Sequence, residues 1–402
     1  MLPDGEPVPA DGSLPQTALA GFGEHPFGAY VHVPFCRTRC GYCDFNTYTA
    51  TELGGGASQA AYQNVVRREI ELAAKVLPGN GTRVSTVFFG GGTPTLLSPG
   101  QLGDILTRVD DAFGLAEDAE VTIEANPESV GPRTLEQLRK QGVTRVSFGM
   151  QSSEQHVLTV LDRAHEPGRP QQCARWAREA GFEHVSLDLI YGTPGESDDD
   201  WRRSLDAALE AGPDHISAYA LIVEQGTRLA ARVRRGEVRP PDDDVLADRY
   251  LIADDVLTAA GFAWYEISNW AAGAQAACRH NMLYWTGGDW WGFGPGAHSH
   301  VAGTRWWNVR HPSAYAERLA AGQSPAQARE VLTAGERRME EIMLRTRLAE
   351  GAPLSVLTAD AYLSAERAVA SALLDAASFA AGRLVLTREG RLLADAVIRD
   401  LT

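Results

Sequence analysis

The chain has 402 residues and a formal net charge of −15, and 44% of its residues are hydrophobic while 22% are charged. This composition is typical of globular proteins, and the length predicts about two domains. The acidic balance argues against nucleic-acid binding and against electrostatic adhesion to an anionic membrane. The sequence has neither the roughly 18 consecutive apolar residues of a membrane-spanning helix nor the basic start of a secretory signal. We therefore expect a cytoplasmic protein without direct membrane insertion.

Taken in chain order, residues 1–26 are rich in Pro, Gly, Asp and Ala without periodicity, which predicts a loosely ordered N-terminal arm. Strands and helices then alternate in the pattern of a parallel α/β architecture. Strands are expected at residues 30–35, 86–89, 121–125, 145–150, 185–191 and 215–223, with helices at 58–77 and 134–141 among the connections. Six such units are too few for a closed eight-fold barrel. The spacing alone allows either a partial barrel or a doubly wound sheet.

The C-terminal part of the chain differs in composition from the alternating region. From about Val331 it is helical in pattern and rich in alanine, and residues 384–393 read as strand–turn–strand followed by a short helix. We predict a small helical, winged-helix-like domain over residues 311–402. Residues 27–310 then form the α/β domain together with an extension.

Three of the five cysteines, Cys36, Cys40 and Cys43, are spaced C-x3-C-x2-C in the loop after the first expected strand. Thiolates are preferred ligands of iron–sulfur clusters and of zinc. Three of them hold three corners of a cubane and leave the fourth metal open to another ligand. A disulfide is disfavoured in a reducing cytoplasm. A zinc site needs a fourth ligand, for which His32 is a candidate.

Residues 30–45, YVHVPFCRTRCGYCDF, resemble the radical S-adenosylmethionine (SAM) superfamily. Within it they are most similar to the group of oxygen-independent coproporphyrinogen III oxidases and HemW haem chaperones. The resemblance implies an α/β fold with a partial (β/α)6 barrel and a HemN-like C-terminal domain. It also implies a [4Fe–4S] cluster on the three cysteines and SAM on the unique iron, where reduction yields a 5′-deoxyadenosyl radical.

Polar residues and glycines follow the expected strands at their carboxyl ends, where binding groups gather in parallel α/β folds. Asp188 is informative because a carboxylate inside an apolar strand needs a partner. A glycine-rich turn exposes backbone groups to a closely approaching ligand. The resemblance implies that the SAM site comprises Tyr30, Tyr42, Gly91, Gly92, Thr93, Glu124, Gln151, Arg163 and Asp188.

Two features separate the oxidases from the chaperones. The oxidases carry a further cysteine two residues after the third, where this chain has Phe45. Residues 278–285, CRHNMLYW, resemble the His-Asn-x-x-Tyr-Trp signature of HemW proteins, which predicts His280 as a haem ligand. Weaker candidate ligands are Cys278, His298 and His300.

We therefore expect a chaperone that binds a [4Fe–4S] cluster, SAM and haem and passes haem to respiratory proteins. The alternatives are an oxygen-independent coproporphyrinogen III oxidase, which we do not favour, and a radical SAM protein acting on another substrate.

Overall fold

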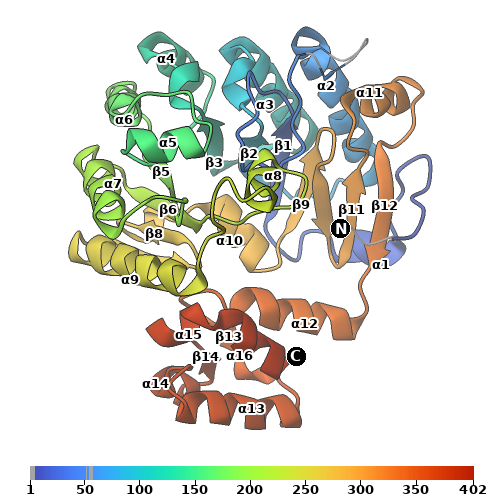
Figure 1. The fold of residues 1–402 in the computed structure, drawn as a ribbon. Helices are drawn as coiled ribbons and strands as arrows, with labels where there is room; N and C mark the ends of the chain where they lie inside the picture. The colour runs from blue at the N-terminus through green and yellow to red at the C-terminus, as the bar shows by residue number, and fades with distance from the viewer. Residues whose placement is uncertain (1–4, 51, 54–57) are drawn as a thin grey trace.

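A computed structural model describes residues 5–50, 52–53 and 58–402. Within these residues a twelve-stranded sheet forms the body of the protein, in the order β12-β11-β10-β9-β1-β2-β3-β4-β5-β6-β8-β7 (Figure 1). Six parallel strands occupy its centre, namely β1 (Phe27–Val33), β2 (Val84–Gly91), β3 (Leu115–Ala125), β4 (Arg145–Gln151), β5 (His184–Tyr191) and β6 (His215–Ala220).

The order of these strands decides between the two architectures that the spacing allowed. The six parallel strands follow one another in the sheet in chain order, without the reversal that defines a doubly wound sheet. β1 pairs with β9 on its outer side and β6 pairs with β8, so the first and last parallel strands do not close on each other. The expected partial (β/α)6 barrel is confirmed.

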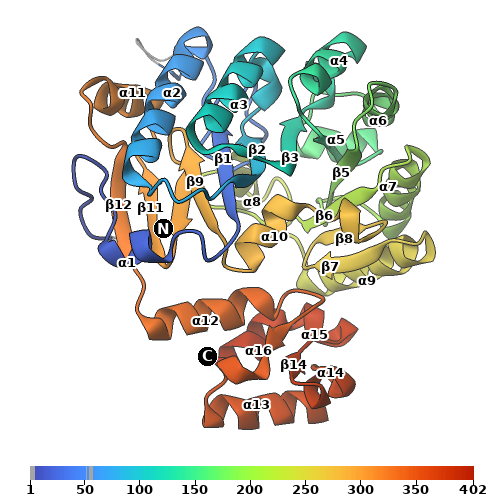
Figure 2. The ribbon, with the colours of Figure 1, turned by 180° about the vertical axis from the view of Figure 1, so that it is seen from behind.

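Helices cover the outer face of the parallel strands (Figure 2). They are α2 (Gln59–Val76), α3 (Pro99–Phe113), α4 (Pro132–Lys140), α6 (Arg169–Glu179) and α7 (Asp198–Glu210). α5 (Gln155–Val160) lies instead near the carboxyl ends of β5 and β6, where its Val157 packs with Ile190 and Leu221. The predicted caps are present: the Ser58 hydroxyl accepts from the Ala61 N–H, and Ser98 with Gln101 forms a capping box ahead of Pro99. These caps fix where the long connections end and thus where the loops above the barrel begin.

Antiparallel strands extend both sides of the parallel core. After β6 the chain forms α8 (Arg228–Arg234), α9 (Asp243–Ala259), β7 (Ala263–Glu266), β8 (Asn269–Ala271) and α10 (Arg279–Trp285). β8 and β7 extend the sheet past β6, whereas α10 contacts β1 and β2. Beyond β1 lie β9 (Asp289–Phe293), β10 (His298–Val301), β11 (Thr304–Asn308), α11 (Pro312–Ala320) and β12 (Ala326–Val331). Because β12 pairs with β11 in the large sheet, the expected boundary at residue 311 is wrong. The C-terminal unit begins with α12 (Ala334–Arg345).

The C-terminal unit has a small hydrophobic core of its own, which includes Ile342, Leu384 and Leu401. It consists of α12, α13 (Ala359–Ala370), α14 (Ala376–Ala380), α15 (Arg388–Leu392), α16 (Ala394–Leu401) and the paired β13 (Ala352–Pro353) and β14 (Arg383–Leu384). The expected strand–turn–strand at 384–393 is wrong, because the Thr387 hydroxyl caps Gly390 N–H and begins α15 instead. Arg391 attaches the unit to the barrel through Asp254 of α9, at 2.9 Å.

The N-terminal segment is more ordered than predicted. Residues 16–21 form α1 (Gln16–Gly21), and Glu6 bridges to Arg329 of β12. Ala18 of α1 is buried, and so are Leu14 and Phe22, which flank the helix on either side. The expectation of a loosely ordered arm is therefore wrong for residues 5–26, while residues 1–4 lie outside the described part.

Within the described residues, no helix is long and apolar enough to cross a membrane.

Candidate functional site

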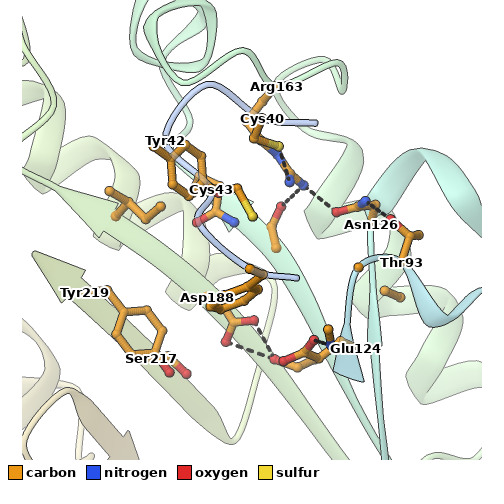
Figure 3. Close-up of a pocket in the computed structure, with 18 of the residues that line it drawn as sticks. Cys40, Tyr42, Cys43, Thr93, Glu124, Asn126, Arg163, Asp188, Ser217 and Tyr219 are labelled. Atoms are coloured by element: carbon orange, nitrogen blue, oxygen red, sulfur yellow. Dashed lines mark hydrogen bonds between the residues drawn. The ribbon is translucent and has the colours of Figure 1, made fainter. Parts of the chain in front are cut away.

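The cysteine loop lies at the carboxyl end of β1, above the mouth of the barrel. Cys36, Cys40 and Cys43 all line a cavity of about 460 Å³, which is also lined by residues of the parallel strands. Figure 3 shows Cys40 and Cys43 in this cavity. The Cys36 N–H donates to the Tyr48 carbonyl at 3.0 Å, and the Cys43 N–H donates to the Cys40 carbonyl at 3.3 Å. These backbone bonds fold the loop so that the three thiols face one space.

The three thiols fit an iron–sulfur cluster better than a zinc ion. Cys36, Cys40 and Cys43 do not form a group, among the described residues, whose ligand atoms all lie within 4.8 Å of one another. Zinc–sulfur bonds of about 2.3 Å would hold tetrahedral ligand sulfurs roughly 3.8 Å apart. Cysteines on a cubane bind separate irons and stand further apart. The residues present fit a [4Fe–4S] cluster.

A chain of polar contacts links two of the cluster thiols across three strand ends. The Thr93 hydroxyl lies 4.0 Å from the Cys36 sulfur and accepts from Asn126 Nδ2 at 2.8 Å. Asn126 Oδ1 accepts from Arg163 Nη2 at 2.8 Å, and Arg163 Nη1 lies 3.5 Å from the Cys40 sulfur. The guanidinium thus brings a positive charge beside the cysteine loop, where it would face the negatively charged thiolates and sulfides of a cluster.

Two carboxyl groups line the same cavity below the cysteine loop. Glu124 Oε2 accepts from the Gly91 N–H at 3.2 Å, and both Asp188 oxygens accept from the Ser147 hydroxyl at 2.9 and 2.8 Å. Burial raises the pKa of Glu124 to about 8, and the neighbouring Asp188 adds to this shift. Burial also raises the pKa of Asp188. A cationic ligand with hydroxyl groups beside them would stabilise the ionised carboxylates, which suits the sulfonium and ribose of SAM.

The predicted glycines of the second loop have a steric role. Gly91 has φ +105°, and a Cβ there would lie 2.6 Å from the His32 ring. A Cβ on Gly92 would lie 2.5 Å from the Phe35 carbonyl. Both positions therefore require glycine so that β2 can approach the start of the cysteine loop. Gln151, also predicted, lines the cavity with φ +64° at the end of β4.

The two predicted tyrosines lie in different places. Tyr42 lines the cavity of the cysteines, and burial raises the pKa of its phenol. Tyr30 instead lines an adjoining cavity of about 260 Å³, which shares Phe45 and Gly91 with the first. The Tyr30 hydroxyl bonds to His32 Nδ1 at 3.0 Å, and His32 Nε2 bonds to the Asn46 carbonyl at 2.9 Å. Both ring nitrogens of His32 are thus engaged, so it is not free to ligate zinc.

His280 lies in the core below the cavities and lines neither of them. It is 1% exposed, its Nδ1 bonds to the Thr86 hydroxyl at 2.8 Å and its Nε2 to the Tyr284 hydroxyl at 2.7 Å. Its ring stacks on Phe88 with centroids 5.1 Å apart. These contacts join α10 to β2. In this conformation His280 has no nitrogen available for a haem iron, so the structure does not support the predicted coordination.

The sequence reading missed several residues of the cavity. Asn126 connects Thr93 to Arg163, and Ser147 holds Asp188. Tyr219 stands at the rim opposite the cysteine loop (Figure 3). Asn126 follows the end of β3 and Tyr219 lies near the end of β6, a position that could have identified both, whereas Ser147 lies inside β4.

The sequence of this chain is similar to those of known proteins. Residues 30–208 match the radical SAM superfamily. Over 383 residues, covering 95% of this chain and 96% of the relative, the sequence is 55% identical to the protein named "Heme chaperone HemW" from Mycobacterium tuberculosis. The chain belongs to the HemW family of radical SAM proteins. The HemW of Escherichia coli is 35% identical over 333 residues, which cover 82% of this chain and 84% of the relative.

A solved structure confirms the fold of this HemW family member. Coproporphyrinogen III oxidase (HemN) from Escherichia coli superposes with a TM-score of 0.82 over 98% of this chain and 94% of that one. Its sequence identity of 22% shows a shared fold only. The radical SAM superfamily implies a [4Fe–4S] cluster and SAM, and in this superfamily the reduced cluster supplies the electron that cleaves SAM. Here Cys36, Cys40 and Cys43 would hold the cluster, with the SAM-facing groups described above below it.

Proposed function

We propose that this protein is a haem chaperone, which binds haem beside a [4Fe–4S] cluster and SAM and delivers it to respiratory proteins. The observation that carries the proposal is the end-to-end similarity to relatives named as haem chaperones, at 55% identity over 95% of the chain. The superposition on a coproporphyrinogen oxidase does not favour that activity, because identity is only 22%. We expect the protein to work in the cytoplasm.

The rim of the larger cavity has the character of a site for a flat apolar ligand. Phe45, Tyr219 and Ile222 line it and are 59%, 43% and 65% exposed. Exposed large apolar side chains gathered at a cavity mouth are typical of ligand or partner sites. Phe45 also occupies the position where the resembling oxidases have an additional cysteine. Phe45 lines the adjoining 260 Å³ cavity as well, so it offers a porphyrin an apolar surface where the two cavities meet.

In this proposal the barrel residues bind and orient the cofactors. Arg163 holds positive charge against the cluster, while Asn126 fixes the guanidinium between strand ends. Glu124 and Asp188, which line the same cavity, would bind the hydroxyl and cationic groups of SAM.

The test is an anaerobic assay of cluster-reconstituted protein with SAM, a reductant and coproporphyrinogen III, alongside a titration with haem. We expect saturable haem binding and no protoporphyrinogen. The Cys36→Ser variant serves as a control, because it should lose cluster absorbance while still binding haem. Decarboxylation at an ordinary enzyme rate would contradict the chaperone function and favour the oxidase.

Transfer of haem is tested separately, by mixing the haem-loaded protein with an apo respiratory haem protein and following its spectrum. Failure of any haem to leave the chaperone would contradict the delivery part of the proposal.

A further inference from the structure

The cavity beside the cysteine loop contains an imidazole that the rest of the site does not use. This 260 Å³ cavity is lined by Tyr30, His32, Phe45, Asn46, Gly91, Gly296, His298, Asn308 and Arg310. His298 on β10 and Arg310 after β11 are exposed, so the cavity opens to solvent on their side. The proposed function requires a haem site, and the distribution of free ligand atoms indicates where it lies.

Three other histidines are excluded by their hydrogen bonds. His280 and His32 are engaged at both ring nitrogens, as described above. His215, on the floor of the larger cavity, bonds through Nδ1 to the Ser186 hydroxyl at 2.7 Å and through Nε2 to the Tyr265 hydroxyl at 2.8 Å. None of the three rings has a nitrogen free for a metal.

Cys278 is also unsuitable as a ligand. It is buried and its thiol lies 3.6 Å from a Glu120 carboxylate oxygen. Burial and this negative neighbour raise the pKa of the thiol, which opposes the thiolate that haem iron binds. Among the described residues lining the two cavities, His298 is the histidine whose ring forms no hydrogen bond.

We propose that His298 is the axial ligand of the haem iron and that Arg310 binds a haem propionate at the mouth of this cavity. The inference rests on the proposed haem-chaperone function and names the residues of its cargo site. The ring of His298 stacks on Trp307, with centroids 6.0 Å apart and planes at 27°, which holds the imidazole in place.

Arg310 has N–H groups available to donate hydrogen bonds to a propionate. Its Nε lies 3.4 Å from Asn46 Oδ1, and within the described residues its two terminal nitrogens make no hydrogen bond. Its carbonyl accepts from Asn46 Nδ2 at 2.8 Å and from the Tyr48 hydroxyl at 3.1 Å, so the backbone is fixed to the cysteine loop. Guanidinium groups bind carboxylates through paired hydrogen bonds. The exposed ring of Phe45 forms an apolar wall that the macrocycle covers.

The decisive experiment replaces the proposed imidazole nitrogen ligand of the haem iron with a thiolate sulfur. Full-length, cluster-reconstituted protein with His298→Cys is loaded with haem, and its ferrous–CO and electron paramagnetic resonance spectra are recorded. We expect the signature of thiolate ligation, whereas His280→Cys should retain the histidine signature. His298→Ala should weaken haem binding at least about tenfold and be rescued by added imidazole. His25→Ala, an exposed histidine that lines neither cavity, is the control and should bind haem as the wild type does.

The propionate contact is tested with haem and its dimethyl ester. The wild type should prefer the free acid, Arg310→Met should lose the preference, and Arg310→Lys should restore part of it. An unchanged haem spectrum in His298→Cys, or a thiolate signature in His280→Cys, would overturn the assignment while leaving the chaperone function intact. Absence of saturable haem binding by the wild type would overturn both. Cluster absorbance and SAM affinity, measured on the same samples, show that each variant is folded.

Discussion

Glu69 provides a quantitative test of how the wall of the smaller cavity is built. It projects from α2, is 1% exposed, and accepts from the Gly294 N–H at 2.8 Å, from Asn308 Nδ2 at 2.7 Å and from the Tyr315 hydroxyl. Burial raises the pKa of Glu69 from 4.5 to about 7, although these hydrogen bonds lower it. The carboxyl group therefore connects three segments behind the haem site that we propose.

The raised pKa sets a sign and a magnitude for the pH dependence of stability. Between pH 4.5 and 7 the folded protein holds a proton on Glu69 that the unfolded chain has lost, so stability falls as pH rises. One pKa unit corresponds to 1.36 kcal/mol, so this group alone costs about 2–3 kcal/mol of unfolding free energy between pH 5 and pH 8. Other buried carboxyl groups titrate in the same range, so the slope of the wild type alone is not diagnostic.

Glu69→Gln isolates the effect because glutamine cannot ionise. At pH 5 the variant should be less stable by about 1 kcal/mol, since the amide nitrogen faces donors and one hydrogen bond is lost. The difference should reverse by pH 8, where the wild type has an ionised, buried carboxylate. Urea unfolding of both proteins without cluster, at pH 5, 6, 7 and 8, measures the difference. If the difference in unfolding free energy between the two proteins stayed constant from pH 5 to pH 8, the reasoning would be refuted.

Three further substitutions test the larger cavity. Gly91→Ala should destabilise the protein by about 1–3 kcal/mol through its positive φ and the contact with His32, seen as a lower melting temperature, whereas Gly100→Ala in α3 has space and should not. Asn126→Ala removes the bond that orients Arg163, and a redox titration should show a shifted cluster potential with the cluster retained; an unchanged potential would contradict this role. Asp188→Asn should weaken SAM binding by about 10–100-fold in equilibrium dialysis, because hydrogen bonds to a charged group are worth about 1.5–3 kcal/mol; equal affinity would exclude a direct contact.

Much of the barrel could be predicted because its signals are local. The parallel strands are short apolar runs followed by glycine or polar residues, and Ser58 and Ser98 mark helix starts unambiguously. The additional strands β9 to β12 could not be predicted, because their aromatic residues contact one another only when the sheet has formed. Trp291, for example, packs edge-on against Trp306 with ring centroids 4.8 Å apart. Pairings of this kind depend on residues distant in sequence. The predicted C-terminal boundary at residue 311 is too early for the same reason, since β12 joins the large sheet only through its pairing with β11.

Some residues of the candidate site could be predicted from the sequence, and others could not. Asp188 stood out because a carboxylate in an apolar strand needs a partner, and Ser147 is that partner. His280 was assigned to haem because a motif shows residue types and spacing but not neighbours. Thr86 and Tyr284 occupy its two nitrogens, and Thr86 lies 194 residues away in the chain. A motif histidine is thus a ligand candidate only until its hydrogen bonds are known.

His32 links β1 to the cysteine loop, and its two hydrogen bonds require one particular tautomer of the ring. The Asn46 carbonyl can only accept, so His32 Nε2 carries the proton and Nδ1 accepts from the Tyr30 hydroxyl. Burial lowers the pKa of His32 to about 4, so this bridge does not titrate near neutral pH, in contrast to Glu69. It also requires Gly91, since a side chain there would displace the ring. One face of the loop is therefore held independently of pH, while the wall behind the proposed haem site responds to it.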